Sequence, residues 1–283
     1  MATFQNRATL TYNGQSVASN TVTGEITETL KMTKTALLPT YGDDRIVYIV
    51  TIVNSGAQPF TGLVLTDDLG AYPFGGETVY PLSYVDGSLS LFENGEPQSP
   101  PAVTADAGLT VTDVSVPANG NIVLIYAVNA TGYAPRAAGE GVTNTVKATG
   151  GGVVSPLSAE ATVLAEENAR LSIYKSLTPN VVPENGQIAF TFVIENTGVS
   201  PADAAANVLV SDLFDPILSD LSVTLDGTPM ARAAGYTYDD ATGQFQTVAG
   251  AITVPAATVT QDPDTGAYTV QPGKTTLVVS GTV

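Results

Sequence analysis

The sequence predicts an all-β protein in which an N-terminal β-hairpin precedes two tandem β-sandwich domains. Three observations support this prediction. Apolar and polar residues alternate along most of the chain, and the strand-favouring residues Val, Ile, Thr and Tyr are abundant. Asn, Gly and Pro separate the alternating stretches at short intervals, which is typical of sandwiches. The chain also aligns with itself, so one set of strands occurs twice.

Four stretches indicate the longest strands: RIVYIVTIVNSG (45–56), NIVLIYAVNAT (121–131), IAFTFVIENTG (188–198) and KTTLVVSGTV (274–283). No stretch has a convincing helical period. The segment SPADAAANVL (200–209) can hold one helical turn at most.

The internal repeat gives the order of the domains. Residues 30–69 align with 171–214, which places Lys34 on Lys175 and Asp67 on Asp212. The Lys-to-Asp interval is 33 residues in the first copy and 37 in the second (67 − 34 and 212 − 175), because of a loop insertion around Ala204–Ala206. Residues 114–131 align in turn with 268–283. We therefore expect one sandwich over 30–166 and a second over 167–283.

The two copies end differently. The first continues into a closing hairpin at 141–166, whereas the second has no such hairpin before Val283. The opening segment of the chain has the same layout, with Asn6 matching Asn144 and with Ala8, Leu10 and Tyr12 alternating before an Asn-Gly turn. Residues 1–29 are therefore expected to form a spare closing hairpin, in which a strand begins at Asn6.

The repeated motifs TKTALLPTYGDDRIVYIVTIVNSG, LVLTDDL and VTNTVKATG, together with NRATLTYNGQSVASNTVTGEI at the amino end, resemble the bacterial conserved-repeat family called domain of unknown function 11. The resemblance covers essentially the whole chain. It implies immunoglobulin-like sandwiches in extracellular surface, adhesin-like or spore-appendage proteins, and it implies no enzyme activity. The displaced hairpin departs from the family's pattern.

A sandwich without its closing strands exposes an apolar groove. Filling it with about five side chains, at roughly 1.5–3 kcal/mol each, gives a gross driving force of order 10 kcal/mol. The connector GEITE reaches at most about 17 Å at full extension, whereas a domain of this size is roughly 35 Å across. The expected donor is therefore the hairpin of a neighbouring molecule, in a head-to-tail homopolymer that grows as a filament. In the alternative, the hairpin packs on the first domain of a fragment.

Two residue sets are candidates for self-catalysed Lys–Asn isopeptide bonds. The reaction needs a neutral buried Lys, an adjacent Asn carbonyl and a protonated carboxylic acid. The first domain offers Lys34, Asp67 and Asn144. The second offers Lys175 and Asp212, and its Asn would be Asn6 of the neighbouring chain.

A structural interpretation of the same residues stays open. Both lysines can be solvent-facing strand residues, and the two aspartates can begin turns, with Asp68 competing with Asp67. The acidic segments YDDATGQF (238–245) and QDPDTGAY (261–268) lack the alternating oxygen ligands of a calcium loop, so they are interpreted as hairpin turns.

Composition narrows the class of function. A net charge of −17 argues against nucleic acid and anionic membranes as partners. The absence of Cys and His excludes zinc sites, thiol chemistry and His-based triads, and we expect no cofactor, metal or enzymatic activity. No signal peptide or membrane-spanning segment is visible, which favours a spore appendage over a secreted pilin.

The leading expectation is thus a structural subunit of an extracellular filament on a cell or spore surface. The alternative is an adhesion module that recognises sugar or protein through its loops. Such a module would need a cluster of exposed aromatic side chains, for which the sequence offers Tyr72, Phe74, Tyr80 and Tyr84.

Overall fold

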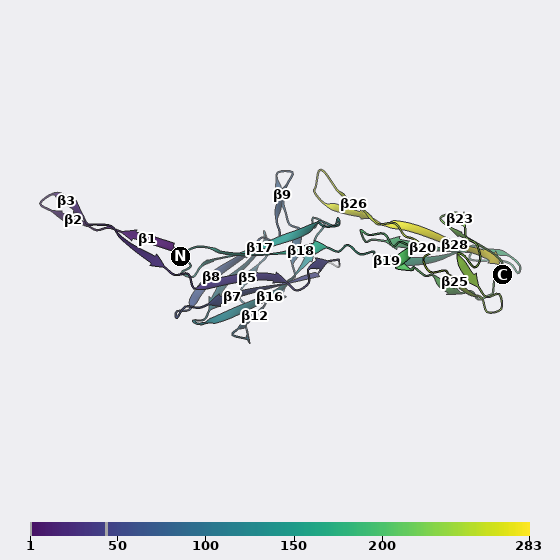
Figure 1. Cartoon of the computed structure of the whole chain (residues 1–283), viewed down its shortest axis with the longest axis horizontal. Helices are drawn as coiled ribbons and strands as arrows, with labels where there is room; N and C mark the ends of the chain where they lie inside the picture. Colours follow the sequence, from purple (N-terminus) through teal and green to yellow (C-terminus); the bar gives the residue numbers. More distant parts are fainter. Residues whose placement is uncertain (1, 43–44) are drawn as a thin grey trace. The chain divides into compact units, whose positions relative to one another are not determined.

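The computed structural model describes residues 2–42 and 45–283 and is built almost entirely of β-strands (Figure 1). Apart from strands, the regular structure of this described part consists of one short 3₁₀ turn, η1 (Ala204–Ala206). The all-β sandwich prediction is therefore confirmed. η1 falls in the loop insertion that the repeat comparison identified, and Asp203 caps it by accepting a hydrogen bond from the Ala205 N–H.

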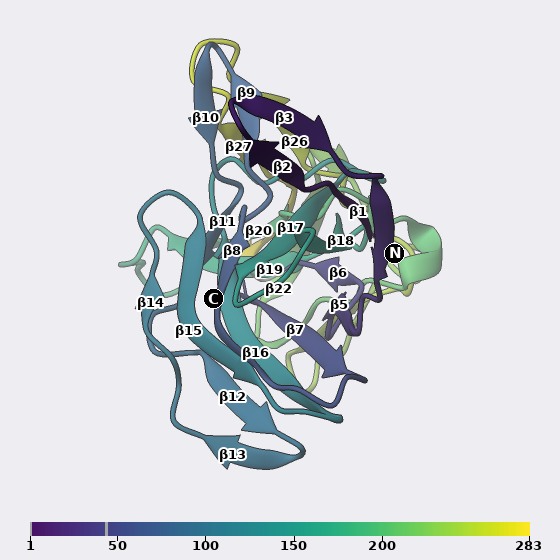
Figure 2. The same ribbon diagram turned by 90° about the vertical axis from the view of Figure 1, so that its left-hand side faces the viewer.

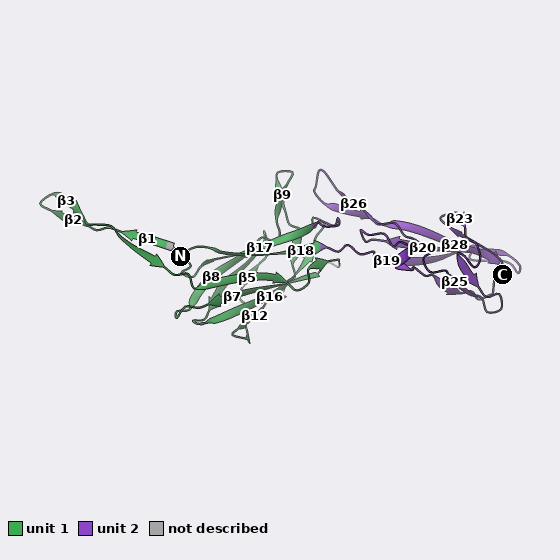
Figure 3. Ribbon diagram, viewed as in Figure 1, with its two compact units in different colours: residues 1–134, 141–164 green, residues 135–140, 165–283 purple. Residues whose placement is uncertain are grey.

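The chain divides into two compact units (Figure 3). The first contains residues 1–134 and 141–164, and the second contains 135–140 and 165–283. The segment 135–140 thus groups with the second unit, whereas the sequence-based division placed it in the first domain.

The amino end forms a long antiparallel hairpin of β1 (Ala2–Asn6), β2 (Thr9–Tyr12), β3 (Gln15–Ala18) and β4 (Val22–Ile26). β1 pairs with β4, and β2 pairs with β3, which lies beside it in Figure 2. Among the described residues, none of the four strands pairs with a strand of either sandwich. Asn13 and Gly14 form the turn, with φ of 45° and 77°, as a type I′ hairpin turn requires. Asn6 ends β1 instead of beginning a strand as expected.

The first sandwich has two facing sheets. One has the order β13-β12-β16-β7-β5, with β11 also paired to β16, and the other has the order β14-β15-β8-β17-β18-β6. The strands of this unit are β5 (Leu30–Ala36), β6 (Thr40–Tyr41), β7 (Arg45–Asn54), β8 (Phe60–Asp67), β9 (Tyr72–Phe74), β10 (Glu77–Val79), β11 (Leu82–Tyr84), β12 (Ser90–Glu93), β13 (Glu96–Gln98), β14 (Val103–Thr104), β15 (Leu109–Val116), β16 (Gly120–Ala130), β17 (Gly141–Gly150) and β18 (Leu157–Ala165).

Alternation along the strands produces the core of this sandwich. In β7 the even-numbered residues from Ile46 to Asn54 are buried and the odd-numbered ones are less so, because successive side chains of a strand point to opposite faces. β17 follows the same rule, with Val142, Asn144, Val146 and Ala148 buried. Asn144 is therefore a polar residue on an otherwise apolar inner face.

The second sandwich repeats one sheet of the first but not the other. Its larger sheet has the order β19-β20-β28-β22-β23, which corresponds strand for strand to β5-β7-β16-β12-β13. Its second sheet has the order β21-β25-β24, and β26 and β27 form a separate hairpin. The strands are β19 (Leu171–Thr178), β20 (Gln187–Asn196), β21 (Ser211–Leu213), β22 (Ser219–Leu225), β23 (Thr228–Pro229), β24 (Tyr236–Tyr238), β25 (Gln244–Thr247), β26 (Thr258–Gln261), β27 (Tyr268–Gln271) and β28 (Gly273–Thr282).

The two acidic segments connect paired strands, as expected for turns. Residues 239–243 join β24 to β25, and residues 262–267 join β26 to β27. The N–H groups of Ala241 and Thr265 hold the pKa of Asp239 and Asp262, respectively, below the usual range. Among the described residues there is no cluster of acidic side chains that could hold a metal ion.

Candidate functional site

Lys34 and Asp67 meet in the interior of the first sandwich. Lys34 lies in β5 and Asp67 ends β8 in the facing sheet, with exposed side-chain fractions of 0% and 3%. The Lys34 Nζ lies 2.5 Å from the Asp67 Oδ2. The solvent-facing interpretation of Lys34 is therefore wrong for this residue.

Desolvation is the dominant influence on Lys34. Burial lowers the pKa of its amine, and the charge of Asp67 opposes this shift only in part. A lowered pKa increases the fraction of Lys34 that is present as the neutral, nucleophilic amine at a given pH.

Asp67, and not its neighbour Asp68, faces the core. The Leu69 N–H donates to the Asp67 Oδ1 at 3.0 Å, so this carboxyl is held from both sides. Asp68 is exposed and accepts hydrogen bonds from the N–H groups of Gly70 and Thr145. The two adjacent aspartates therefore have separate roles, and Asp68 secures the turn that the structural interpretation assigned to an aspartate.

Asn144 lies on the strand beside Asp67. Asp67 pairs with Val146 of β17, and Asn144 is two residues along the same strand on the same face. The Asn144 side chain is fully buried, and neither its Oδ1 nor its Nδ2 has a hydrogen-bond partner. A buried amide without partners costs about 1–3 kcal/mol per unsatisfied group, so its presence requires an explanation.

Sequence reasoning missed two tyrosines in this site. The Tyr126 hydroxyl donates a hydrogen bond to the Asp67 Oδ2. Tyr48, on the neighbouring strand, places its ring centroid 4.6 Å from the Lys34 Nζ. The signal was present in the strands RIVYIVTIVNSG and NIVLIYAVNAT, where each tyrosine occupies an inward-facing position.

The corresponding residues of the second unit are brought together in a far more open setting. Lys175 of β19 forms an ion pair with Asp212 of β21, and their side chains are 42% and 18% exposed. The rings of Phe190, Phe192 and Phe214 surround the Lys175 Nζ at centroid distances of 4.7–5.6 Å. The pair therefore repeats the geometry of Lys34 and Asp67 without their burial.

The difference in exposure follows from the strand order. β8 pairs with β15 on one side and β17 on the other, whereas β21 pairs only with β25 within the described part of the chain. The register aligns Leu30 with Leu171, since each faces the buried Asn of the next strand. Leu30 is 6% exposed and Leu171 is 41% exposed.

An exposed apolar surface marks this open side of the second unit. We call it the open edge, and it combines the whole of β19 with the segment around β21. A shallow groove between Leu171–Ile173 and Val208–Val210 runs along it. Its large exposed apolar residues are Leu171, Ile173, Tyr174, Leu177, Leu209 and Leu213.

The N-terminal hairpin carries the complementary kind of surface. Leu10 and Tyr12 are 65% and 52% exposed, and Val17 lies directly opposite Leu10 on the same face. Asn6 ends β1, opposite the exposed Val22 of β4. The predicted donor residues Asn6, Ala8, Leu10 and Tyr12 are all solvent-exposed in the isolated chain.

Asn54 and Asn196, which sequence reasoning also missed, make equivalent hydrogen bonds in the two repeats. The Asn54 Nδ2 donates to the carbonyl oxygens of Gln58 and Pro117, and the Asn196 Nδ2 donates to those of Ser200 and Pro255. Both amides are buried and satisfied, unlike that of Asn144. The sequence signal is the matching pair VNSG and ENTG at the end of each long strand.

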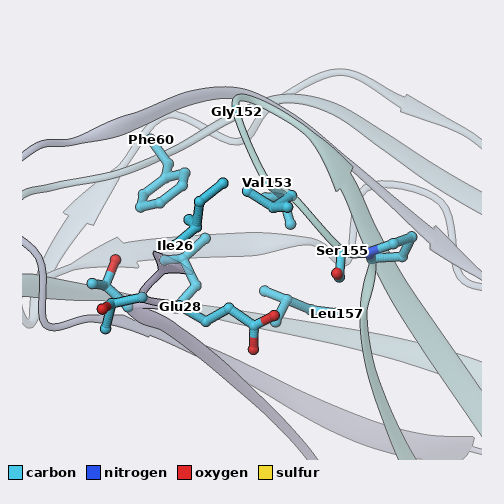
Figure 4. A pocket seen from close by; sticks show the side chains of 12 residues that line it. Ile26, Glu28, Phe60, Gly152, Val153, Ser155 and Leu157 are labelled. Atoms are coloured by element: carbon cyan, nitrogen blue, oxygen red, sulfur yellow. The ribbon is translucent and has the colours of Figure 1, made fainter. Parts of the chain in front are cut away.

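Two other features of the first unit, a pocket and a set of aromatic residues, give little support for ligand binding. The pocket where the hairpin joins the first sandwich is walled by Ile26, Phe60 and Val153, with the carboxylate of Glu28 at its side (Figure 4). Apart from Glu28 its lining residues are uncharged, so it lacks the convergent polar groups that orient a small ligand. The candidate binding aromatics do not form an exposed cluster, since all four are half-buried: Tyr72, Phe74, Tyr80 and Tyr84.

Within the described residues, no helix has the length and apolar character needed to cross a bilayer.

No family model and no curated protein matches this chain. Among solved structures, the pilus backbone RrgB of Streptococcus pneumoniae aligns at 10% identity and a TM-score of 0.34, over 87% of this chain and 55% of that one. BcpA, the major pilin subunit of Bacillus cereus, aligns at 11% identity and a TM-score of 0.37, over 96% and 73%.

A GH20 exo β-N-acetylglucosaminidase of Vibrio harveyi also aligns, at 11% identity and a TM-score of 0.29, over 78% and 39%. The chain spans about half the length of the pilus backbone that it matches. All three alignments have low identity and TM-scores below 0.5, and the all-β assignment depends on the strands and sheets of the chain itself.

Proposed function

We propose that this protein is the structural subunit of an extracellular filament, of the pilus or spore-appendage kind. Subunits join head to tail when the N-terminal hairpin of one chain completes the second sandwich of the next, and Lys–Asn isopeptide bonds lock the assembly. The observation that carries the proposal is the open edge beside β21, on which the Lys175 side chain is exposed and the Asp212 side chain is half-buried. The resemblance to the conserved-repeat family of surface proteins is consistent with this role and remains a prediction.

The open edge supports an acceptor role. In the first sandwich, β17 and β18 occupy the position beside β8, and Lys34 and Asp67 are buried. The corresponding position beside β21 is empty of strands in the described part of the second unit. Adding a hairpin there would pair the β21 edge and bury the apolar side chains of β19, each worth roughly 1.5–3 kcal/mol.

The N-terminal hairpin supports the donor role by its spacing. It has the same length as the closing hairpin of the first sandwich, 25 residues in each case (2–26 and 141–165). In both sequences Asn and apolar residues occupy alternate positions, so a docked hairpin is expected to bring the Asn6 amide to the position that corresponds to Asn144. The matching residues are Phe4, Asn6, Ala8 and Leu10 in the donor and Val142, Asn144, Val146 and Ala148 in the closing hairpin.

The proposed bond forms by amide exchange. The neutral Lys Nζ attacks the Asn Cγ, so that an Nζ–Cγ bond forms and the Cγ–Nδ2 bond breaks, releasing ammonia. In this proposal the Asp acts as a carboxylate and not as the protonated acid expected from the sequence: it takes a proton from the amine and returns it to the departing nitrogen. Lys34, Asp67 and Asn144 perform this step within one chain, and Lys175, Asp212 and the neighbouring chain's Asn6 perform it between chains.

A denaturing gel of boiled protein, combined with mass measurement of each band, tests the proposal. We expect a ladder of multimers in which each junction is lighter by one ammonia. K175A and N6A are expected to give filaments that fall apart on boiling, while the matched controls K274A and N20A keep the ladder. Deletion of residues 1–26 is expected to abolish filaments altogether.

Two results would contradict the proposal separately. Filaments that persist after the deletion would refute hairpin donation. A single monomer band of unmodified mass from the wild type would refute the covalent bonds and leave the non-covalent assembly to be judged by the deletion.

A further inference from the structure

Two buried hydroxyl groups line the Lys34–Asp67–Asn144 site and have no counterpart at Lys175. We propose that Tyr126 and Tyr48 assist bond formation in the first sandwich, Tyr126 by positioning Asp67 and Tyr48 by donating a hydrogen bond to the Asn144 oxygen as it gains negative charge. This inference rests on the proposed isopeptide chemistry and adds the groups that make one of the two sites self-sufficient.

Tyr126 acts through Asp67. Its hydroxyl and the Lys34 Nζ both contact the Asp67 Oδ2, while the Leu69 N–H occupies Oδ1. The carboxyl therefore has one fixed orientation, with Oδ2 directed at the amine. A fixed proton acceptor next to the nucleophile is what general base catalysis requires.

Tyr48 faces the electrophile. Its side chain is fully buried, and neither its hydroxyl nor the Asn144 amide has a hydrogen-bond partner. The Asn144 amide is near enough to influence the ionisation of this hydroxyl. The Tyr48 and Tyr126 ring centroids lie 5.9 Å apart, on neighbouring strands of one sheet. When Lys34 attacks, charge develops on the Asn144 Oδ1, and a preplaced donor in a dry site stabilises it.

Both hydroxyls keep their protons. Burial raises the pKa of Tyr48 and of Tyr126, with the charge of Asp67 adding to the effect in each case. The two groups therefore remain hydrogen-bond donors throughout the pH range in which the lysine reacts.

The second sandwich has lost both groups. Lys34 pairs with Val50 and Lys175 with Phe192, which aligns Tyr48 with Phe190. Tyr48 pairs with Tyr126, whereas Phe190 pairs with Val279. The step at Lys175 must therefore proceed without these two hydroxyls, on a residue set that is completed only when another chain supplies Asn6.

Each proton in the step has a named place. The Asp67 Oδ2 receives a proton from the Lys34 Nζ as the Nζ–Cγ bond forms, and this proton then passes to Nδ2 as the Cγ–Nδ2 bond breaks. Tyr48 and Tyr126 act only as hydrogen-bond donors in this step, and both keep their protons. The products are the Lys34–Asn144 amide and ammonia.

Intact-mass measurement of full-length N6A chains tests the inference, because N6A leaves Lys34 and Asn144 as the pair that loses ammonia. The fraction of lighter protein is followed over time at several pH values for the parent, Y48F and Y126F, with Y84F as the matched control. Y84F removes a hydroxyl that accepts a hydrogen bond from the Leu89 N–H outside the site. K34A gives the mass of the unreacted chain.

We expect Y48F to form the bond roughly 100- to 1,000-fold more slowly, as for the loss of one oxyanion donor. Y126F is expected to slow it as well and to change its pH dependence, because the proton acceptor for Lys34 is no longer fixed. Y84F is expected to react like the parent. If Y126F acted only by loosening the packing, it would lower the rate of bond formation by the same factor at every pH.

Bond formation in Y48F and Y126F at the parent rate and with the parent pH profile would overturn the inference while leaving the proposed bond intact. A parent chain that keeps its unmodified mass would overturn the intramolecular bond, and the roles of both tyrosines with it.

Discussion

At the scale of single residues, two equivalent lysines of this protein differ in solvent exposure. Lys34 and Lys175 occupy equivalent strand positions and contact equivalent aspartates, yet the Lys34 side chain is fully buried and that of Lys175 is 42% exposed. Their neighbours within the larger sheet do not explain this, since both lysines face aromatic rings. The difference comes from β17 and β18, which cover the first site.

The lowered pKa of Lys34 predicts a pH dependence for the N144A variant, which cannot form the bond. Because the folded chain releases this proton at lower pH than the unfolded chain, the unfolded state binds more protons between the lowered pKa and the ordinary value of 10.5. The free energy of unfolding of N144A should therefore rise with pH across this window. Thermal unfolding between about pH 7 and about pH 9.5 measures it, below the range where tyrosine ionisation acts in the opposite direction.

The wild type and the K34M/N144A double variant provide the comparison. In the wild type the nitrogen is expected to be an amide that does not titrate, and in the double variant it is absent. Equal pH slopes in all three proteins would contradict a neutral-amine role for Lys34.

At the scale of elements, the N-terminal hairpin is a β-ribbon with one apolar face and no sheet to cover. Leu10, Tyr12 and Val17 are all more than half exposed, although side chains of this kind are normally covered in a sandwich strand. The local turn and pairing are complete within the hairpin. In the proposed assembly, this apolar face is the one that docks on the open edge of another chain.

Variants on the two faces of this hairpin should differ in their effect on assembly. L10D places a charge on the apolar face, and we expect it to prevent filament formation, because docking would bury that charge without a partner. T9D places the same charge on the opposite face of β2, and we expect it to assemble normally. Sedimentation and electron microscopy of both variants measure assembly, and equal behaviour would argue against docking through this face.

At the scale of the whole molecule, the chain alternates hairpins and sandwich bodies. The hairpin 141–165 completes the body that precedes it, and the hairpin 2–26 has the same length and the same pattern. If the proposed assembly forms, a filament repeats one arrangement at every step, with an unbroken chain at one junction and an intermolecular contact at the next. Heterologous contacts of this kind propagate as a filament when the rotation between successive subunits does not close a ring.

Moving the hairpin tests this arrangement directly. A variant without residues 1–26, with 2–26 attached after Val283 through a linker copied from 131–140, should complete its own second sandwich. We expect a monomer that does not polymerise, unfolds at higher temperature than the simple deletion, and is lighter by one ammonia for the Lys175 bond. Size-exclusion chromatography, calorimetry and intact mass measure these three properties.

The control for this variant carries Asn6→Ala in the transplanted hairpin. It should remain monomeric and keep the mass of its unreacted Lys175. Continued polymerisation of the transplanted protein would show that the hairpin and the open edge are not partners.

Much of this could be predicted from local pattern. The period of two in RIVYIVTIVNSG indicates a buried strand from that stretch alone, because successive strand side chains face opposite ways. The Asn13-Gly14 turn depends only on which residues tolerate positive φ. The repeat comparison predicted that Lys34 and Asp67 belong to one site, because equivalent strands of two repeats keep equivalent inner faces.

The sequence by itself thus determined the fold class, the repeat and the candidate Lys, Asp and Asn positions. Only the tertiary structure decided that Asp67 and not Asp68 faces Lys34, that Tyr126 and Tyr48 complete the first site, and that β19 and β21 are left uncovered. The physical reason is that alternation fixes which face of a strand a residue lies on, whereas burial depends on which other strands cover that face. Such strands are distant in the sequence, and in the proposed filament they belong to another molecule.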